Sequence, residues 1–114
     1  GRPAEIVERG RFFFRDPDSY DPQAAAKHWK PETPARVAAV ARGLGALSEF
    51  TPSAIEEEVR RSATALGVGA GALIHPLRLA LTGQGQGPGL FELMAVLGSE
   101  TCMRRIDAAL RALG

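Results

Sequence analysis

Apolar residues recur at intervals of three and four positions along most of the 114-residue chain, which is the spacing of a helix with one buried face. No segment alternates between apolar and polar residues as a half-buried strand would. The pattern therefore predicts an all-α fold, a compact helical bundle of about five to seven helices.

Residues that start and stop helices divide this pattern into segments. Asp21 before Pro22 and Thr51 before Pro52 are typical starts, because proline is tolerated at the first helical position. A capping box that begins at Ser53 competes with Thr51 as the start of the same helix. The expected helices span residues 4–14, 22–29, 33 to an end left open by two glycines, 52–66, 71–81, 90–97 and 99–113.

Two of these helices carry specific expectations about burial and capping. The segment 90–97 is apolar nearly all round, with Glu92 as its only charged residue, which is typical of a helix buried on most sides. Ser99 is expected to cap the helix that follows. On that last helix four charged residues are expected to face water: Arg104, Arg105, Asp107 and Arg111.

Composition and charge narrow the classes of function. Hydrophobic residues make up 45% of the chain and charged residues 24%, which is the profile of a soluble globular protein. The net charge is only +1, so any binding of nucleic acid must come from a local patch. Cys102 is the single cysteine and is expected to be a small buried residue, and the two separated histidines supply no metal-ligand set.

The chain shows no sign of a membrane or secretory segment. No apolar run approaches the roughly 20 residues that span a bilayer. The N-terminal stretch GRPAEIVERG lacks the apolar core of a signal peptide. We therefore expect a cytoplasmic protein without a membrane partner. We also expect it to be monomeric.

The glycine-rich stretch GQGQGPG does not fit a nucleotide-binding motif. A dinucleotide fingerprint needs G-x-G-x-x-G after a strand, but the sixth residue counted from Gly83 is Pro88, and counted from Gly85 it is Leu90. A P-loop needs a lysine, and no lysine follows Lys30. We expect no catalytic residue and no cofactor of its own in this chain.

Two interpretations of the glycine-rich stretch remain. It is a simple connector between helices, or it exposes its backbone to a ligand that approaches closely. In the second case Arg78, one helical turn before the loop, reaches over it, and Leu90 and Phe91 supply an apolar surface on its other side. Such a pocket suits one unpaired RNA base.

Three further stretches add a family resemblance. HPLRLALTG, PGLFELMAVLG and ETCMRRIDAAL together resemble the C-terminal region of bacterial glutamyl-tRNA synthetase, a class I aminoacyl-tRNA synthetase. The resemblance implies an all-α, cage-like anticodon-binding fold. It also implies a division into residues 1–32, the tail of a preceding helical subdomain with its connector, and residues 33–114, the C-terminal anticodon-binding domain.

The resemblance further implies a role in recognising a tRNA anticodon. The ligation of glutamate, which uses ATP and magnesium, would take place in an upstream catalytic domain of the same chain. The residues that match the family's anticodon site are Arg78, Gly87, Pro88, Leu90 and Phe91. At Gly87 the family often has serine or threonine, so that a hydroxyl is missing here.

Two alternatives stay open at this point. The aromatic cluster FFF at residues 12–14 would serve a helical protein-interaction module. A free-standing tRNA-binding regulator is the other alternative.

Overall fold

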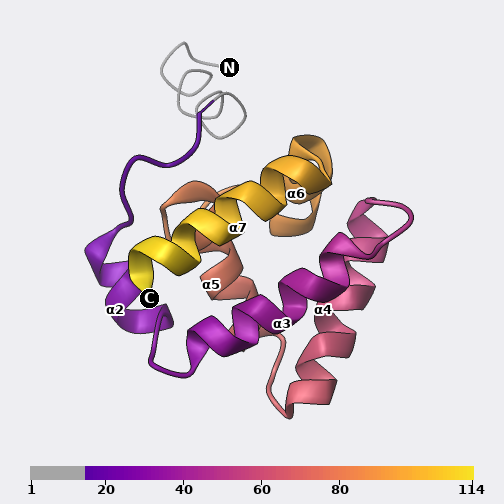
Figure 1. Ribbon diagram of the computed structural model, residues 1–114, viewed down its shortest axis with the longest axis horizontal. Helices are drawn as coiled ribbons and strands as arrows, with labels where there is room; N and C mark the ends of the chain where they lie inside the picture. Colours follow the sequence, from indigo (N-terminus) through magenta and orange to yellow (C-terminus); the bar gives the residue numbers. More distant parts are fainter. Residues whose placement is uncertain (1–14) are drawn as a thin grey trace.

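Six α-helices form all the regular secondary structure of residues 15–114, the part of the chain that the computed structural model describes (Figure 1). The helices are α2 (Pro22–His28), α3 (Thr33–Gly45), α4 (Pro52–Leu66), α5 (Gly71–Thr82), α6 (Leu90–Leu97) and α7 (Ser99–Leu113). The predicted all-α fold is confirmed, while the helix expected at residues 4–14 lies outside the described range. None of the helices in this range has both the length and the apolar character that a membrane crossing requires.

α5 is the central helix of the bundle. It contacts α2, α3, α4 and α7, and in Figure 1 it lies behind α7 and α3. Most of its residues from the third onward are buried: Leu73, Pro76, Leu77, Leu79, Ala80, Leu81 and Thr82. Because α5 is covered on most sides, its C-terminal end, where the next loop begins, is held in position.

The other helices each bury one apolar stripe against α5 or against one another. The stripe of α3 expected from the apolar spacing is buried at Val37, Val40 and Leu44, and Leu47, just past the helix, is partly buried. The stripe of α4 is buried at Ile55, Val59 and Ala63, but the expectation that Leu66 completes it is wrong, because this residue is 39% exposed at the end of the helix. The stripe of α7 includes Cys102, which is fully buried as expected. Burial raises the pKa of the Cys102 thiol to about 12, so this thiol stays protonated and inert at neutral pH.

Local signals fix the helix starts as the sequence indicates. The Asp21 side chain accepts a hydrogen bond of 2.9 Å from the Ala24 amide at the start of α2. The Thr51 hydroxyl accepts one of 3.2 Å from the Ala54 amide at the start of α4, so Thr51 rather than Ser53 is the cap. Each bond satisfies an amide that has no partner within its own helix.

Gly43 has a packing role that explains its place inside α3. A Cβ atom at this position would lie 1.9 Å from Oε2 of Glu58, whose side chain is buried between α3 and α4. The Glu58 carboxylate accepts hydrogen bonds from Arg61 and, at 3.1 Å, from the Ser62 hydroxyl. The glycine that lowers the helix propensity of α3 thus makes room for a paired carboxylate.

Two expectations at the junction of α6 and α7 are wrong. Val96 is 69% exposed, because it shares with Glu92 the one side of α6 that faces outward, while the other residues of the helix are buried or partly buried. Ser99 makes no capping hydrogen bond, because a single residue, Gly98 with φ of +89°, joins the two helices. Ser99 is therefore already the first residue of α7.

The expectation that Arg105 faces water is also wrong, because this residue is buried and only 2% exposed. Its Nη1 donates to the Leu81 carbonyl oxygen at 2.9 Å, and its Nη2 donates to the Arg15 carbonyl oxygen at 3.0 Å. Its Nε donates to Oδ1 of Asp16 at 3.0 Å. The guanidinium thus joins α7, the end of α5 and the segment that precedes α2.

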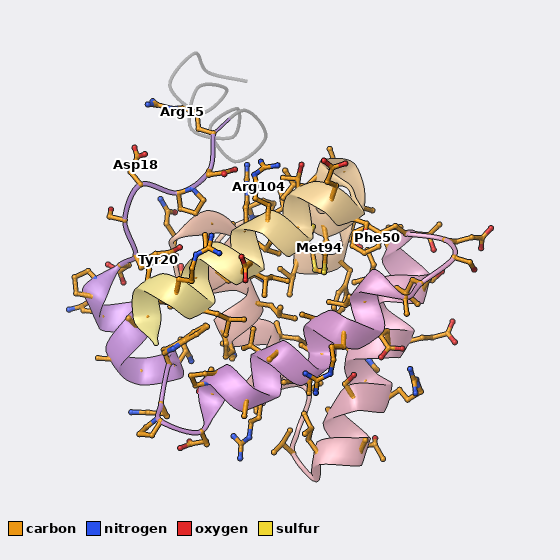
Figure 2. All side chains as sticks on the ribbon, in the orientation of Figure 1. Arg15, Asp18, Tyr20, Phe50, Met94 and Arg104 are labelled. Carbon is orange, nitrogen blue, oxygen red and sulfur yellow. The ribbon has the colours of Figure 1, made fainter. Side chains whose placement is uncertain are left out.

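Arg104 binds the same carboxylate from the surface of α7. Its Nε and Nη2 donate to the two oxygens of Asp16 at 3.1 and 2.9 Å. Figure 2 shows Arg104 at the edge of α7 nearest the segment that carries Arg15 and Asp18. The hydrogen bond from Arg104 is the main reason why the pKa of Asp16 lies below its ordinary value.

The two neighbouring arginines provide a matched test of this contact. We expect Arg105→Met to lower the free energy of unfolding by roughly 2–4 kcal/mol, because the buried Leu81 carbonyl group loses its donor and the bonds to Arg15 and Asp16 are lost with it. Arg104→Met should lower it far less, because that ion pair is exposed to solvent and screened. Urea unfolding followed by far-UV circular dichroism measures both, and equal losses would contradict the assignment.

The pH dependence of stability tests Asp16. Because its pKa is lowered in the folded state, its ionised form stabilises the fold at pH values above the unfolded pKa, and this stabilisation is lost as the pH falls through the folded pKa. Asp16→Asn should therefore lower the urea midpoint near neutral pH, with the difference from the parent shrinking below about pH 4. Asp18→Asn is the control, and a difference for Asp16→Asn that stays constant down to acid pH would refute the prediction.

Candidate nucleic-acid interface

The glycine-rich loop, residues 83–89, joins α5 to α6 and lies on the surface. Gln84, Gln86, Gly87, Pro88 and Gly89 are all exposed, whereas Gly83 is buried. The two halves of this loop have different surroundings, and the difference decides which part of its backbone a ligand can reach.

The first half of the loop packs against the segment that leads into α2. The Asp21 amide donates to the Gly83 carbonyl oxygen at 2.7 Å, and a Cβ at Gly83, which has φ of +76°, would lie 2.4 Å from the Ser19 oxygen. A Cβ at Gly85 would lie 3.1 Å from the Cβ of Ala24. These two glycines therefore allow chain segments to approach each other, and the expectation of an open backbone is wrong at this end.

The second half of the loop lies under Arg78. Nη1 of this arginine donates to the Pro88 carbonyl oxygen at 2.5 Å, and a Cβ at Gly87 would meet only this nitrogen, 3.9 Å away. Within residues 15–114 the other guanidinium N–H groups of Arg78 have no acceptor. The structure thus brings Arg78, Gly87 and Pro88 together at an exposed edge with free hydrogen-bond donors.

Leu90 and Phe91 do not form the exposed apolar surface expected from the sequence. Leu90 is 3% exposed because it is the first residue of α6 on the side that faces the core. Phe91 is half-buried and packs against the same core. The apolar surface next to Pro88 is instead a small hollow of about 130 Å³ that includes Leu93 and the exposed Val96, which sequence reasoning placed in the interior.

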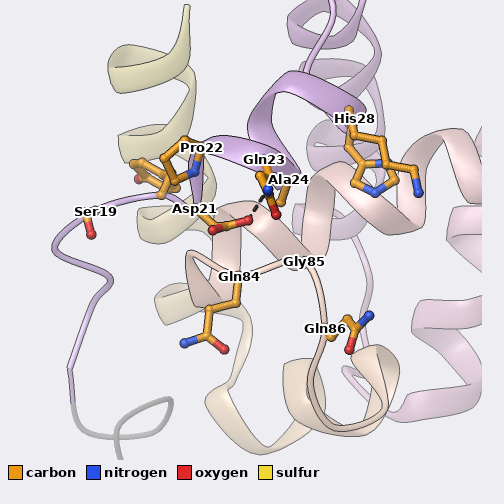
Figure 3. Close-up of a pocket in the computed structure, with 11 residues that line it drawn as sticks. Ser19, Asp21, Pro22, Gln23, Ala24, His28, Gln84, Gly85 and Gln86 are labelled. Carbon is orange, nitrogen blue, oxygen red and sulfur yellow. Dashed lines mark hydrogen bonds between the residues drawn. The ribbon is translucent and has the colours of Figure 1, made fainter.

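A larger hollow, of about 640 Å³, lies between α2 and the first half of the loop (Figure 3). Gln84 and Gln86 line it from the loop, and Gln23, Lys27 and His28 line it from α2. Sequence reasoning missed this feature, because no local pattern shows that α2 docks beside the loop.

The imidazole of His28 is held in place by a second histidine. Its ring stacks on that of His75 from α5, with ring centres 4.4 Å apart and planes 13° from parallel. Burial lowers the pKa of His28, and the nearby His75 and lysine residues lower it further. His28 therefore enters the hollow as a neutral ring with one donor and one acceptor nitrogen.

Comparison with protein families gives one match that covers nearly the whole chain. The family model described as an anticodon binding domain matches residues 2–110. The glutamate-tRNA ligase of Desulforudis audaxviator is 41% identical over 97% of this chain, and that of Chloroherpeton thalassium is 40% identical over 96%. The chain spans only 23% and 22% of these two relatives.

Solved structures give the same result. The chain superimposes on a glutamate tRNA ligase from Elizabethkingia meningosepticum with a TM-score of 0.92 and 35% identity, over 96% of this chain and 22% of that one. A glutamate-tRNA synthetase from Elizabethkingia anophelis gives a TM-score of 0.84 and 32% identity, over 94% and 20% of the two chains.

The two halves of the loop are expected to respond differently to a side chain. Gly83→Ala should lower the free energy of unfolding by roughly 2–4 kcal/mol, because the left-handed backbone and the Ser19 oxygen both oppose a Cβ atom. Gly87→Ser should change it by no more than about 0.5 kcal/mol, because the position is open to solvent. The urea midpoints of the two variants measure these losses of stability. A Gly87→Ser protein as unstable as Gly83→Ala would contradict the claim that Gly87 is open and Gly83 is packed.

Proposed function

We propose, from the premise that the chain belongs to the anticodon binding domain family, that it binds the anticodon loop of glutamate tRNA as part of a glutamate-tRNA ligase. The chain corresponds to about a fifth of its ligase relatives, so the ligation chemistry is assigned to a catalytic domain elsewhere in the same longer protein. ATP and magnesium would act in that domain, in the cytoplasm. Within this chain, residues 33–114 would form the C-terminal anticodon-binding domain, with residues 1–32 as the tail of a preceding subdomain and connector.

The placement of Arg78 over the exposed half of the loop is the observation that carries this proposal. A guanidinium has five N–H donors, and one bond to the Pro88 carbonyl holds it in position without using the rest. Unpaired RNA bases are read by donors and acceptors on their edges and by flat surfaces on their faces. An arginine fixed beside an open backbone provides the first of these.

The remaining site residues would act around Arg78. Gly87 offers only backbone groups to the base, since it has no side-chain hydroxyl, and the Pro88 ring offers an apolar edge. Leu90 would act as a positioning residue, because its buried side chain anchors the end of the loop in the core. Phe91, half-buried beside it, would support the loop and expose its remaining edge to the RNA.

The comparisons do not favour the protein-interaction alternative. All the relatives described above are named glutamate-tRNA ligase or glutamate-tRNA synthetase. The aromatic residues 12–14, on which that alternative depends, lie outside the described range.

Substitution of Arg78 tests the proposal directly. Arg78→Ala should weaken binding of a glutamate tRNA transcript by roughly 1–3 kcal/mol, the scale of a specific base contact. Fluorescence anisotropy at one fixed salt concentration measures the affinity, because phosphate contacts are sensitive to salt. Circular dichroism of the variant checks that loss of the bond to Pro88 leaves the fold intact.

Arg60→Ala is the control, because Arg60 is an exposed arginine on α4 that is paired with Glu56. It should bind the transcript as the parent does. Parental affinity in the folded Arg78→Ala protein would overturn the role of Arg78.

A further inference from the structure

We infer that the hollow between α2 and the first half of the glycine-rich loop is a second nucleotide site, which takes an unpaired nucleotide adjacent to the one held at Arg78. The inference rests on the proposed function, because it names a further part of the same RNA. It concerns residues of α2 that the sequence pattern did not single out as binding residues.

Side-chain amides are concentrated at this hollow. The chain contains three glutamines and no asparagine, and all three glutamines line the hollow. Figure 3 shows Gln84 and Gln86 on the loop side of the hollow and Gln23 on the α2 side. All three are exposed, and within residues 15–114 none of their side chains makes a hydrogen bond.

Amide groups are well suited to the edge of a nucleobase. Each presents a donor and an acceptor side by side, as the edges of the bases do, and can therefore form a bidentate pair. The neutral ring of His28 adds another donor and acceptor to the same wall. This set recognises a hydrogen-bonding, largely uncharged group rather than a hydrocarbon.

The charges at the hollow fit a single phosphate. Lys27 supplies an ammonium group on the exposed side of α2 and has no carboxylate partner within the described residues. The Asp21 carboxylate also lines the hollow, but it already accepts the Ala24 amide as the cap of α2. The hollow thus has one cation and one carboxylate that already caps a helix. This charge fits the single phosphate of a nucleotide within a chain better than a free polyphosphate, which carries several negative charges.

The hollow has the size and rigidity of a binding site. Its volume of about 640 Å³ lies within the range of small-molecule pockets. Its two walls are joined by the bond of 2.7 Å between Asp21 and Gly83, and the Thr82 hydroxyl accepts the Gln84 amide at 3.1 Å. Gln86 precedes Gly87 directly, so the hollow and the Arg78 site are neighbours on one loop.

The test uses the 114-residue chain and an RNA hairpin that carries the anticodon stem and loop of glutamate tRNA. Lys27→Gln should weaken binding and lower the slope of log affinity against log salt by about 1, as the loss of one phosphate contact requires. Gln86→Ala should weaken binding about five-fold or more without changing that slope. Lys30→Gln is the matched control, because Lys30 does not line the hollow, and it should stay within about two-fold of the parent.

Hairpins with one abasic residue at each loop position locate the bound base. The parent protein should bind more weakly when the abasic residue stands at the position that the hollow holds. The Gln86→Ala protein should lose little further affinity for that same abasic hairpin. Arg78→Ala should remove the sensitivity at a different, neighbouring position. Coupling of Gln86 to one abasic position, distinct from that of Arg78, supports the second site.

Other results would distinguish a failure of the second site from a failure of the proposed function. If Arg78→Ala weakens binding while Lys27→Gln and Gln86→Ala bind as the parent does, the second site is wrong and the proposed function stands. The same holds if Lys27→Gln changes the salt slope but Gln86 couples to no abasic position, since only a phosphate contact then remains. If none of the three variants changes the affinity, the proposed function and the second site both fail.

Discussion

The buried guanidinium of Arg105 is the interaction on which the arrangement of the loop depends. It binds the last turn of α5, the backbone of Arg15 and the Asp16 carboxylate at once. The segment held in this way continues directly to Asp21, whose amide binds Gly83 at the start of the glycine-rich loop. A charge that is costly to bury is stabilised by an acceptor at each of its three nitrogens, and these acceptors lie on the two segments that flank the start of the glycine-rich loop.

The glycines of the loop serve two different physical purposes. At Gly83 and Gly85 the absence of a side chain lets the segment before α2 and α2 itself approach the loop. At Gly87, among residues 15–114, a Cβ would have only the Arg78 guanidinium within 4 Å, so the absence of a side chain leaves the backbone open. A single glycine-rich stretch therefore combines a packing surface with the exposed surface at which the RNA site is proposed.

Local signals in the sequence were enough to predict the six helices within residues 15–114, but they did not predict the contacts between distant residues. Thr51 and Asp21 were identified as helix starts because capping depends on residues only three positions away. Arg105 and Val96 were misplaced, because whether a side chain is buried depends on which helices pack beside it. Prediction from the sequence placed Arg78 beside Gly87 and Pro88, because Arg78 lies on α5 only a short distance before the loop that carries the other two. The stack of His28 on His75 joins residues from separate helices and has no local signal.

The bond between Arg78 and the Pro88 carbonyl makes the two partners unequal under mutation. The acceptor belongs to the main chain, so any amino acid at position 88 that preserves the path of the backbone still provides it. The donor exists only while position 78 carries arginine. Sequence drift at the tip of the loop can thus alter the shape of the proposed RNA site while the orientation of the guanidinium is inherited unchanged.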